Sequence, residues 1–493
     1  MDRAHSHRLS WMILAGLTLV RLAFILTPTI DLAPDEAQYW DWSRTFQISY
    51  YSKPPLIAWW NALWTTIFGP TVFGVRIGAV IGSVLLQGVW WWWAARVWRR
   101  PEAAPWVLLI LNTTVFLSAG AVLMTTDNLL LVCFSAAVVL LHRFLQTGRG
   151  SMLLAMALAL GVLAKYTMLA FVPTALLAAW LWERRFGLAA GLWPRLILAL
   201  ALGAVVGLFP VLLWNALHDW VGIKHVLYRG AVMGTKASRW LRLSSPPEFL
   251  ASQVALLTPW WAYFLVRGLR RTADLDPQIA LLGRVFFWPI FGFFFLWSFH
   301  TKIEANWAVS AYVGGLMLVA DSFRRFAQES WHAARRVAVL GVVVAAIVYL
   351  QAVLPVPGPL LARVIGWRDL GEEVGRIMET LDGPAFAFAE EYGVTAELSF
   401  YTPGQKRAYC IDTGRKRNQY DLWPGPGPEF RHAVFVMRGV ETAAPPEVQA
   451  LFATVGPPQV LTTRRLWVQG QTFTVFVCQG FRGTWPKTQS TTF

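Results

Sequence analysis

The residues most capable of chemistry lie in one short segment, Ala33-Pro34-Asp35-Glu36-Ala37-Gln38-Tyr39-Trp40. Pro34 suits the first position of a helix, which would place Asp35 and Glu36 in a first turn where the helix dipole keeps a carboxylate ionised. Neighbouring helical side chains point about 100° apart, so the two acids cannot both be aimed at one atom. We therefore expect one carboxylate to act as a base and the other to brace the loop, although acids at a helix N-terminus often only stabilise the helix.

A second candidate follows at Tyr50-Tyr51-Ser52-Lys53-Pro54-Pro55. A lysine held between aromatic rings and a rigid Pro-Pro pair could act as a point charge for a phosphate, whereas a single interfacial lysine often only snorkels. Further polar groups recur at the ends of apolar segments, where the cost of placing them near hydrocarbon makes each a functional candidate. They are Asp127, Asn128, Lys165, Lys302, Glu304 and Asn306. Apart from Lys302, which is expected at the donor phosphate, these are supporting candidates, as are Tyr39 and Tyr51 beside the two motifs.

The segment 217–248 adds positive charge through Lys224, Arg229, Lys236, Arg239 and Arg242. Two explanations account for this cluster equally well: attraction to a phosphate, and contact with anionic lipid head groups.

One carboxylate with several cations fits transfer of a sugar from a polyprenyl phosphate. Such a donor already carries a good leaving group, so the site needs only a base for the acceptor hydroxyl and cations for the departing phosphate. Asp35, Lys53 and the basic residues between 224 and 242 meet that need. A glycoside hydrolase would instead need a spaced pair of carboxyl groups, and a nucleotide-dependent enzyme would need a glycine-rich phosphate loop.

A metal site is not expected. His218, His225 and His300 show no HExxH or comparable spacing, which is the usual signature of a zinc site built on one helix. We predict that no cofactor is required.

The composition places these residues in a membrane protein. Hydrophobic residues make up 56% of the chain and charged residues only 14%, against about 25% charged in globular domains. Windows of about 20 residues predict about eleven spans, of which 151–164 and 166–182 could form one kinked unit. The windows are 10–28, 72–95, 104–123, 127–146, 151–164, 166–182, 196–216, 249–266, 284–299, 306–322 and 337–355.

The distribution of basic residues predicts the orientation. With a cytoplasmic N-terminus, about 18 arginines fall inside and about nine basic residues outside, so an odd number of spans leaves the C-terminus outside the cytoplasm. Arg21 within the first apolar segment favours a retained helix over a cleaved signal peptide. The inside loops account for much of the net charge of +15, and no nucleic-acid-binding signature is present, so no nucleic-acid partner is expected.

We expect two domains: a transmembrane domain at 1–355, with external loops 29–70 and 217–248, and an external α/β domain at 356–493. Cys410 and Cys478 could pair, although two cysteines in one small domain are more often free. In the first loop, 35–44 and 55–68 should be short helices on the membrane interface. In the C-terminal domain we expect strands at 385–390, 432–438 and 466–479, the last a hairpin around Gln469-Gly470, and helices at 368–381 and 392–401.

Together, these motifs resemble the bacterial membrane glycosyltransferases of the C-type fold, which are related to protein O-mannosyltransferases and to the lipid A aminoarabinose transferase. The resemblance is best over 10–170, where the Asp-Glu pair, Tyr-Ser-Lys-Pro-Pro and Thr-Thr-Asp-Asn stand in the family's order. It extends to Lys302-Ile303-Glu304-Ala305-Asn306-Trp307. In the C-terminal part it is limited to Glu397-Leu398-Ser399-Phe400-Tyr401 and Asn418-Gln419-Tyr420-Asp421-Leu422-Trp423.

This resemblance implies roles for four residues. Asp35 would be the catalytic base and Glu36 would position the acceptor. Lys53 would bind the donor phosphate, and Asp127 would support the first loop. Ser52 stands where the aminoarabinose transferase has a glutamate implicated in metal binding, so neither a bound metal nor that sugar specificity is expected.

We therefore predict an inverting glycosyltransferase at the outer face of the cytoplasmic membrane, with Lys53, Lys224, Arg229 and Lys302 contacting the phosphate of a polyprenyl-phosphate sugar. The expected acceptor is an envelope glycolipid such as lipid A or lipopolysaccharide core, with a protein hydroxyl as the alternative. A transporter or flippase of lipid-linked sugars is the rival from another class. Internal repeats are typical of transporters, and none is found here. A structural assembly protein would leave Asp35 and Lys53 without a role.

Overall fold

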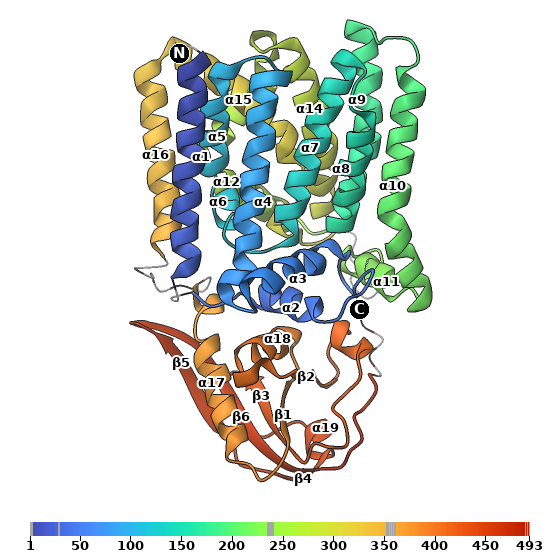
Figure 1. Cartoon of the computed structure of the whole chain (residues 1–493), viewed down its shortest axis with the longest axis vertical. Coiled ribbons are helices and arrows are strands. Elements are labelled where there is room, and N and C mark those ends of the chain that lie inside the picture. The colour runs from blue at the N-terminus through green and yellow to red at the C-terminus, as the bar shows by residue number, and fades with distance from the viewer. Residues whose placement is uncertain are drawn as a thin grey trace.

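The computed structural model shows a bundle of long helices with an α/β domain at one end (Figure 1). It describes residues 3–27, 30–233, 241–351 and 361–488, together with Leu354, Val356, Gly358, Ser490 and Thr492. The expected boundary between the two domains, near residue 355, falls among residues that are only partly described.

Within the described residues, seven helices are long and apolar enough to cross a membrane, which makes the chain a multi-pass membrane protein. A bent pair, α12 (Ser245–Leu257) and α13 (Pro259–Arg270), is an eighth candidate; its two halves meet at 105°. The bend lies at Thr258, because a residue before proline is kept out of the helical region. The seven are α1 (Arg3–Leu26), α4 (Val72–Trp92) with η1 (Trp93–Val97), η3 (Tyr166–Ala170) with α9 (Phe171–Phe186), α7 (Thr126–Thr147), α10 (Leu192–Leu217), α14 (Pro277–Ser298) and α16 (Trp331–Leu350).

The remaining predicted spans are shorter or more polar helices of the same bundle. The segment 104–123 is split at Thr113 and Thr114, while 151–164 is a helix of only 14 residues. The window 306–322 corresponds to a helix whose last turns carry Asp321 and Arg324. These helices are α5 (Ala104–Asn112), α6 (Val115–Gly120), α8 (Ser151–Ala164) and α15 (Ala311–Glu329).

Arg21 shows how the bundle accommodates a charge inside a membrane helix. Its guanidinium is buried and donates hydrogen bonds to Ser83 Oγ at 2.9 Å, to Tyr349 Oη at 3.1 Å and to the side-chain oxygen of Asn112. Because every partner comes from another helix, the arginine joins α1 to α4, α5 and α16 without being left unpaired in hydrocarbon.

Short helices cross the end of the bundle, as Figure 1 shows for α2 (Pro34–Ser43), α3 (Leu56–Phe68) and α11 (Val221–Arg229). The helices expected at 35–44 and 55–68 are therefore confirmed. Leu63, Ile67 and Phe68 on α3 remain exposed, as expected of a helix that lies in the interface with its apolar face toward lipid.

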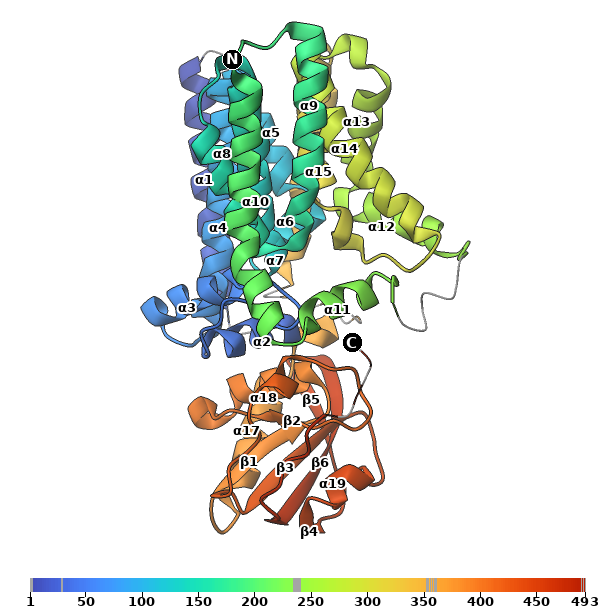
Figure 2. The same cartoon turned by 90° about the vertical axis from the view of Figure 1, so that its right-hand side faces the viewer.

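The C-terminal domain is a mixed sheet with helices against it (Figure 2). The strand order is β2-β1-β3-β6-β4, with β5 paired to β6; β1 is parallel to β2 and β3, and β6 is antiparallel to β3, β4 and β5. Its elements are η7 (Leu361–Val364), α17 (Trp367–Glu379), β1 (Ala385–Ala389), α18 (Tyr392–Tyr401), β2 (Tyr409–Cys410), η9 (Gln419–Leu422), β3 (His432–Arg438), α19 (Pro446–Gln449), β4 (Phe452–Val455), β5 (Gln459–Arg465) and β6 (Val468–Phe481).

Two expectations for this domain are revised. The hairpin turn is at Leu466-Trp467 and not at Gln469-Gly470, because Arg465 pairs with Val468 and Val468 must point into an apolar cluster. Cys410 and Cys478 are both buried and free, so they do not pair.

Hydrogen bonds join the C-terminal domain to the first loop. The Leu32 amide donates to Tyr401 Oη at 2.8 Å, and the Tyr420 hydroxyl donates to Asp41 Oδ2 at 2.9 Å. The two regions thus form one continuous structure around the end of the bundle, and α18 lies against α2 (Figure 1).

Candidate active site

A cavity of about 450 Å³ opens between the first loop, α11 and the C-terminal domain. Both residues on which the sequence-based prediction rests most, Asp35 and Lys53, line it. Its walls are Asp35, Gln38, Tyr39, Tyr51, Ser52, Lys53, His225, Arg229, Glu390, Glu391, Tyr392 and residues 415–419.

Asp35 presents an accessible carboxylate at the start of α2. Pro34 begins the helix, so Asp35 lies in the first turn, and its side chain is exposed toward the cavity. The Tyr392 hydroxyl donates to Asp35 Oδ1 at 3.1 Å. The negative charge of Asp35, and then burial, raise the pKa of Tyr392. The Tyr392 hydroxyl therefore stays protonated and continues to donate its hydrogen bond to Asp35. One oxygen of Asp35 is thereby oriented, while no described lysine or arginine forms an ion pair with it.

Glu36 has a different environment from its neighbour. It is 1% exposed and pairs with Arg76 at 2.9 Å. It also accepts hydrogen bonds from the amides of Met124 at 2.8 Å and Ala33 at 3.0 Å. Its oxygens are fully used, and Glu36 is not among the residues that line the cavity. Glu36 is therefore held within the loop by its own partners, as a bracing residue would be, and the geometry does not support a contact between it and an acceptor.

Lys53 is held by its backbone in a tight segment before α3. The Tyr50 amide donates to the Lys53 carbonyl at 3.1 Å, and the neighbouring Tyr51 amide donates to Gln419 Oε1 at 2.7 Å. Burial, and then the charge of Lys165, lower the pKa of Lys53 to about 8. No carboxylate in the part of the chain that the structure describes lies within ion-pair distance of its ammonium group. Lys53 is thus a partly desolvated cation available to an anion.

Asp127 anchors a polar network behind Lys53. Its carboxylate accepts from Lys165 Nζ and from Asn306 Nδ2, each at 2.6 Å. Asn128 donates to the carbonyls of Ala79 and Gly120 at 3.0 and 2.9 Å. These bonds tie α4, α7, α8 and the segment before α15 together, which is a supporting role for all four predicted side chains.

Of the four predicted basic contacts, Lys53 and Arg229 line the cavity, whereas Lys224 and Lys302 do not. Arg229 lines the cavity and lies 3.7 Å from Glu304. Lys302 instead pairs with Glu248 at 2.7 Å on an exposed surface, and Lys224 is not among the lining residues. The assignment of Lys224 and Lys302 to the phosphate is therefore not supported by the geometry. Lys236 and Arg239 lie outside the described residues.

The C-terminal domain supplies lining residues that sequence reasoning missed. Arg415 is held by two hydrogen bonds to Asp421 at 2.7 and 2.9 Å, and the aromatic ring of Tyr228 lies 5.3 Å from Lys416 Nζ. The consecutive Arg415-Lys416-Arg417 in a chain poor in charge was the available signal. All three line the cavity together with residues of the first loop.

His225 adds a neutral aromatic wall. Its ring lies 4.8 Å from the ring of Tyr51. Burial, and then the charge of Lys53, lower the pKa of His225 to about 3, so the imidazole is uncharged near neutral pH.

No group of three or more described His, Cys, Asp or Glu residues is arranged to hold a metal ion. The prediction that no cofactor is required stays a prediction.

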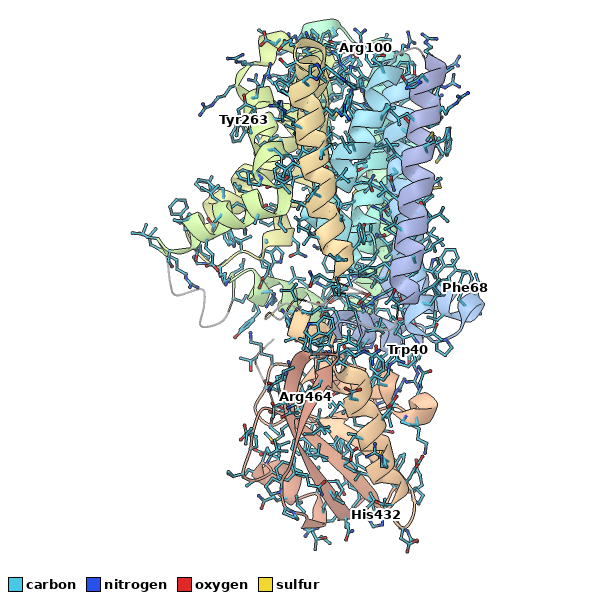
Figure 3. The ribbon with its side chains drawn as sticks, turned by 90° about the vertical axis from the view of Figure 1, so that its left-hand side faces the viewer. Trp40, Phe68, Arg100, Tyr263, His432 and Arg464 are labelled. Atoms are coloured by element: carbon cyan, nitrogen blue, oxygen red, sulfur yellow. The ribbon has the colours of Figure 1, made fainter. Side chains whose placement is uncertain are left out.

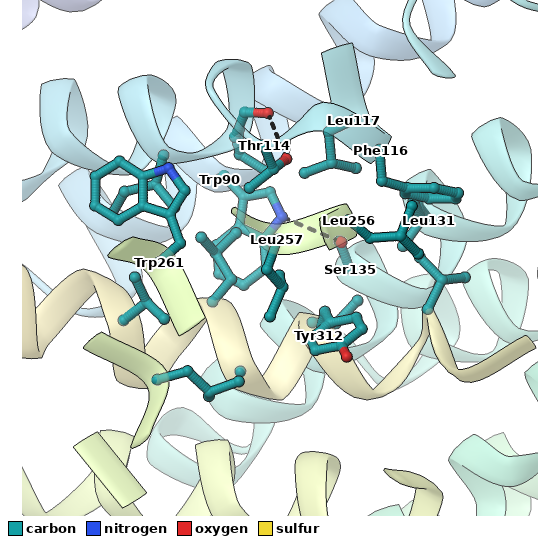
Figure 4. Close-up of a pocket in the computed structure, with 18 of the residues that line it drawn as sticks. Trp90, Thr114, Phe116, Leu117, Leu131, Ser135, Leu256, Leu257, Trp261 and Tyr312 are labelled. Atoms are coloured by element: carbon teal, nitrogen blue, oxygen red, sulfur yellow. Dashed lines mark hydrogen bonds between the residues drawn. The ribbon is translucent and has the colours of Figure 1, made fainter. Parts of the chain in front are cut away.

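Two smaller cavities lead from this network into the bundle. One of about 260 Å³ is lined by Asp127, Asn128 and Asn306 at its polar end, and by Phe116 and Leu117. The second, about 60 Å³, shares Leu86, Phe116, Leu117 and Leu131 with the first and is lined almost entirely by apolar side chains. Figure 4 shows Trp90, Trp261 and Tyr312 around this second cavity, with Trp90 bonded to Ser135.

Comparison with known proteins places this geometry in context. A family model described as Dolichyl-phosphate-mannose-protein mannosyltransferase matches residues 52–214. The lipid A galacturonosyltransferase RgtD of Rhizobium johnstonii is 30% identical over 328 residues, a match that spans 64% of this chain and 65% of RgtD.

Crystal structures of ArnT from Cupriavidus metallidurans share the fold with a TM-score of 0.63, and the alignments cover 94% of this chain and 97% of ArnT. The sequence identities are 17% for the apo state and 18% for the structure bound to undecaprenyl phosphate. The chain thus has the C-type glycosyltransferase fold, and its predicted resemblance to this group is confirmed.

Proposed function

We propose that this chain is an inverting glycosyltransferase that moves a sugar from a polyprenyl phosphate to an envelope glycolipid of the lipid A type. The observation that carries the proposal is the meeting, in one cavity at the end of a membrane bundle, of Asp35, which has no ion-pair partner among the described residues, and Lys53, a partly desolvated cation. The relation to RgtD, whose name specifies lipid A and a galacturonosyl group, supports the acceptor class.

The two residues suit the two ends of a single displacement. The oxygen of the acceptor hydroxyl attacks the anomeric carbon of the donor sugar while Asp35 takes the proton of that hydroxyl. Tyr392 keeps the Asp35 carboxylate oriented. The bond from that carbon to the phosphate oxygen breaks on the opposite face, and the polyprenyl phosphate leaves as an anion. Lys53 and Arg229, which line the same cavity, stabilise the charge that develops on it.

The apolar cavities provide a direction for the lipid chain of the donor. The first is lined by Asp127 and Asn306, and the second, which shares four lining residues with it, is lined by Trp90 within the bundle. Figure 4 shows Trp90 at this second cavity. A phosphate at Lys53 would place the first isoprene units at the membrane level of these side chains. The ArnT structure with bound undecaprenyl phosphate supports a donor of this class.

We also propose that the cavity and the C-terminal domain face the periplasm and that the bundle crosses the inner membrane. The excess of arginine at the opposite end of the bundle supports this orientation through the positive-inside rule.

Mass spectrometry of lipid A tests the proposed function. Cells that carry the gene should show a lipid A species heavier by one sugar residue, and cells with the Asp35→Asn allele should lack it. A glycosylated protein with unchanged lipid A would favour a protein acceptor, which the name of the matching family model also allows.

A further inference from the structure

A further cavity, of about 400 Å³, lies between α1, the start of α4 and the C-terminal domain. We call it the lateral cavity. Among the described residues it has no lining residue in common with the cavity that contains Asp35 and Lys53. Its walls come from the ends of two membrane helices on one side and from α17 and α18 on the other.

The lateral cavity lies at the level of lipid head groups. Both α1 and α4 are candidate membrane spans, and the wall that they form contains Leu26, Val72 and Phe73. Leu26 is 65% exposed. The ring of Phe68, at the end of the interfacial helix α3, lies 5.5 Å from the ring of Phe73. Figure 3 shows Phe68 beside the end of α1, between the bundle and the C-terminal domain. A molecule in this cavity would therefore have apolar side chains of the membrane surface on one side.

The wall formed by the C-terminal domain carries two charges of opposite sign. Arg368 and Glu372 lie one turn apart on α17, and both line the cavity. Side chains at this spacing are neighbours on a helix, with Cβ atoms about 5–6 Å apart, but a cation that precedes the anion is the less favourable order. Within the described part of the chain no ion pair joins the two residues. Both charges are therefore available to a ligand.

Arg368 is oriented by its surroundings but is not neutralised by them. Its Nε lies 3.9 Å from Asp31 Oδ1, which is beyond hydrogen-bond distance. Asp31 Oδ2 instead accepts from the amides of Trp367 at 2.9 Å and Arg368 at 3.4 Å. Burial raises the pKa of Asp31, and these hydrogen bonds and the charges of Arg368 and Arg465 oppose that shift. One carboxyl group thus faces two arginines, and the Arg368 side chain remains 39% exposed.

This pair of charges fits the head group of a zwitterionic phospholipid. A guanidinium binds phosphate oxygens through its N–H donors, and a carboxylate accepts hydrogen bonds from an ammonium group. In an ethanolamine head group a short two-carbon linker separates the phosphate from the ammonium. That separation is comparable with the spacing of side chains one helix turn apart, so one head group can reach Arg368 and Glu372 together.

A choline head group fits the same wall less well. Its quaternary ammonium has no N–H to donate, and such cations are bound by aromatic rings. Tyr401 in the cavity wall is already approached by Arg368, whose guanidinium carbon lies 5.9 Å from the ring centroid. The cation of the ligand is thus left to Glu372, which binds a group that can donate hydrogen bonds.

We propose that the lateral cavity binds phosphatidylethanolamine, with its phosphate at Arg368, its ammonium at Glu372 and its acyl chains along Leu26 and Phe73. The bound lipid joins α17 to the ends of α1 and α4 and so holds the C-terminal domain against the bundle. The site does not depend on the proposed transfer reaction.

Native mass spectrometry of the full-length protein in detergent micelles tests this site. Phosphatidylethanolamine, phosphatidylcholine and phosphatidylglycerol with identical acyl chains are titrated separately, and the affinity of the first bound lipid is measured. We expect phosphatidylethanolamine to bind about tenfold more tightly than either of the others, because only its head group adds a charge-assisted hydrogen bond to Glu372.

Two variants separate the two contacts. Glu372→Gln should weaken phosphatidylethanolamine about tenfold and should not weaken phosphatidylglycerol, whereas Arg368→Gln should weaken both. Glu372 is exposed, so its substitution leaves the packing of α17 intact. Arg376→Gln and Glu379→Gln, at exposed positions of the same helix outside the cavity, are the matched controls and should leave every affinity unchanged.

Equal affinity of the wild-type protein for the three lipids would overturn the site. A preference for phosphatidylglycerol would also overturn it, because the protein would then respond to negative charge alone. If a preference for phosphatidylethanolamine persisted in both Glu372→Gln and Arg368→Gln, the lipid would bind elsewhere on the bundle and the proposal would be wrong.

Discussion

The first loop and the C-terminal domain both line one cavity, but they contribute different kinds of groups. The first loop provides Asp35, which has no described ion-pair partner, and Lys53, which is partly desolvated. The C-terminal domain provides residues held by their own partners, such as Arg415 with Asp421 and Tyr392 with Asp35. The difference is the one expected if, as proposed, the loop carries the reaction while the domain encloses and orients it.

The same contrast appears within the loop, between two adjacent acids. Asp35 faces the cavity and Glu36 is enclosed by Arg76 and two backbone amides. A single step along the helix thus separates an accessible carboxylate from a structural one, and substitutions at the two positions should fail in different ways.

The largest effect on turnover is expected for Asp35→Asn. The amide keeps the shape of the carboxylate but cannot take a proton, so turnover should fall by about two to four orders of magnitude. Purified protein would be compared with wild type for turnover and for donor binding, which should persist. Turnover close to the wild-type value would contradict the assignment of Asp35 as base.

Glu36→Gln should act on stability. Removing the charge leaves Arg76 buried without its counter-ion, which costs about 3–5 kcal/mol of folding free energy. A lowered thermal unfolding midpoint in detergent is the expected observation. If Glu36→Gln unfolded like wild type but lost turnover, Glu36 and not Asp35 would be the reactive acid of the pair.

Lys53→Ala should reduce turnover by about 30- to 1,000-fold, because a charge-assisted contact to the leaving phosphate in a partly dry site contributes roughly 2–4 kcal/mol. Lys53→Arg keeps the charge and should retain part of the activity. The turnover of both variants would be measured at saturating acceptor. If Lys53→Ala were as active as wild type, Lys53 would have no role at the phosphate and would only anchor the loop at the membrane interface.

The pH dependence should follow the same ammonium group. Since the pKa of Lys53 is about 8, its charge is largely present at pH 7 and lost as the pH rises further. Turnover should then be about tenfold lower at pH 9 than at pH 7. Lys53→Arg is the control, because arginine stays charged over this range and should remove the decline.

The smallest effect is expected from the C-terminal wall. Tyr392→Phe removes one hydrogen bond to Asp35, worth about 1 kcal/mol, and should lower turnover about fivefold. Unchanged binding of the donor would show that the tyrosine acts on the carboxylate. A loss as large as that of Asp35→Asn would place the tyrosine in the reaction itself and end the division between the two walls.

The sequence was most informative where chemistry and local structure coincide. Pro34 before two acids predicted the start of α2, and Tyr-Ser-Lys-Pro-Pro predicted a rigid segment before α3. The buried pairing of Glu36 with Arg76 could not be predicted, because the two residues meet only after α4 packs beside α2.

The C-terminal domain was less predictable for a related reason. Strand β2 has two residues and β4 has four, which is too little for a pattern, and the exposed alternation of β5 is weak. The turn at Leu466-Trp467 was misplaced because local preference points to Gln469-Gly470, while packing of Val468 against α1 sets the actual register.

The most direct test measures transfer itself. Purified full-length protein in nanodiscs would be given a synthetic polyprenyl-phosphate sugar and lipid A, and both free polyprenyl phosphate and glycosylated lipid A would be quantified. We expect one polyprenyl phosphate released for each sugar transferred, with the anomeric configuration inverted and both products lost in Asp35→Asn. Movement of intact donor across the bilayer, with no release of polyprenyl phosphate, would contradict the transferase and establish a transporter in its place.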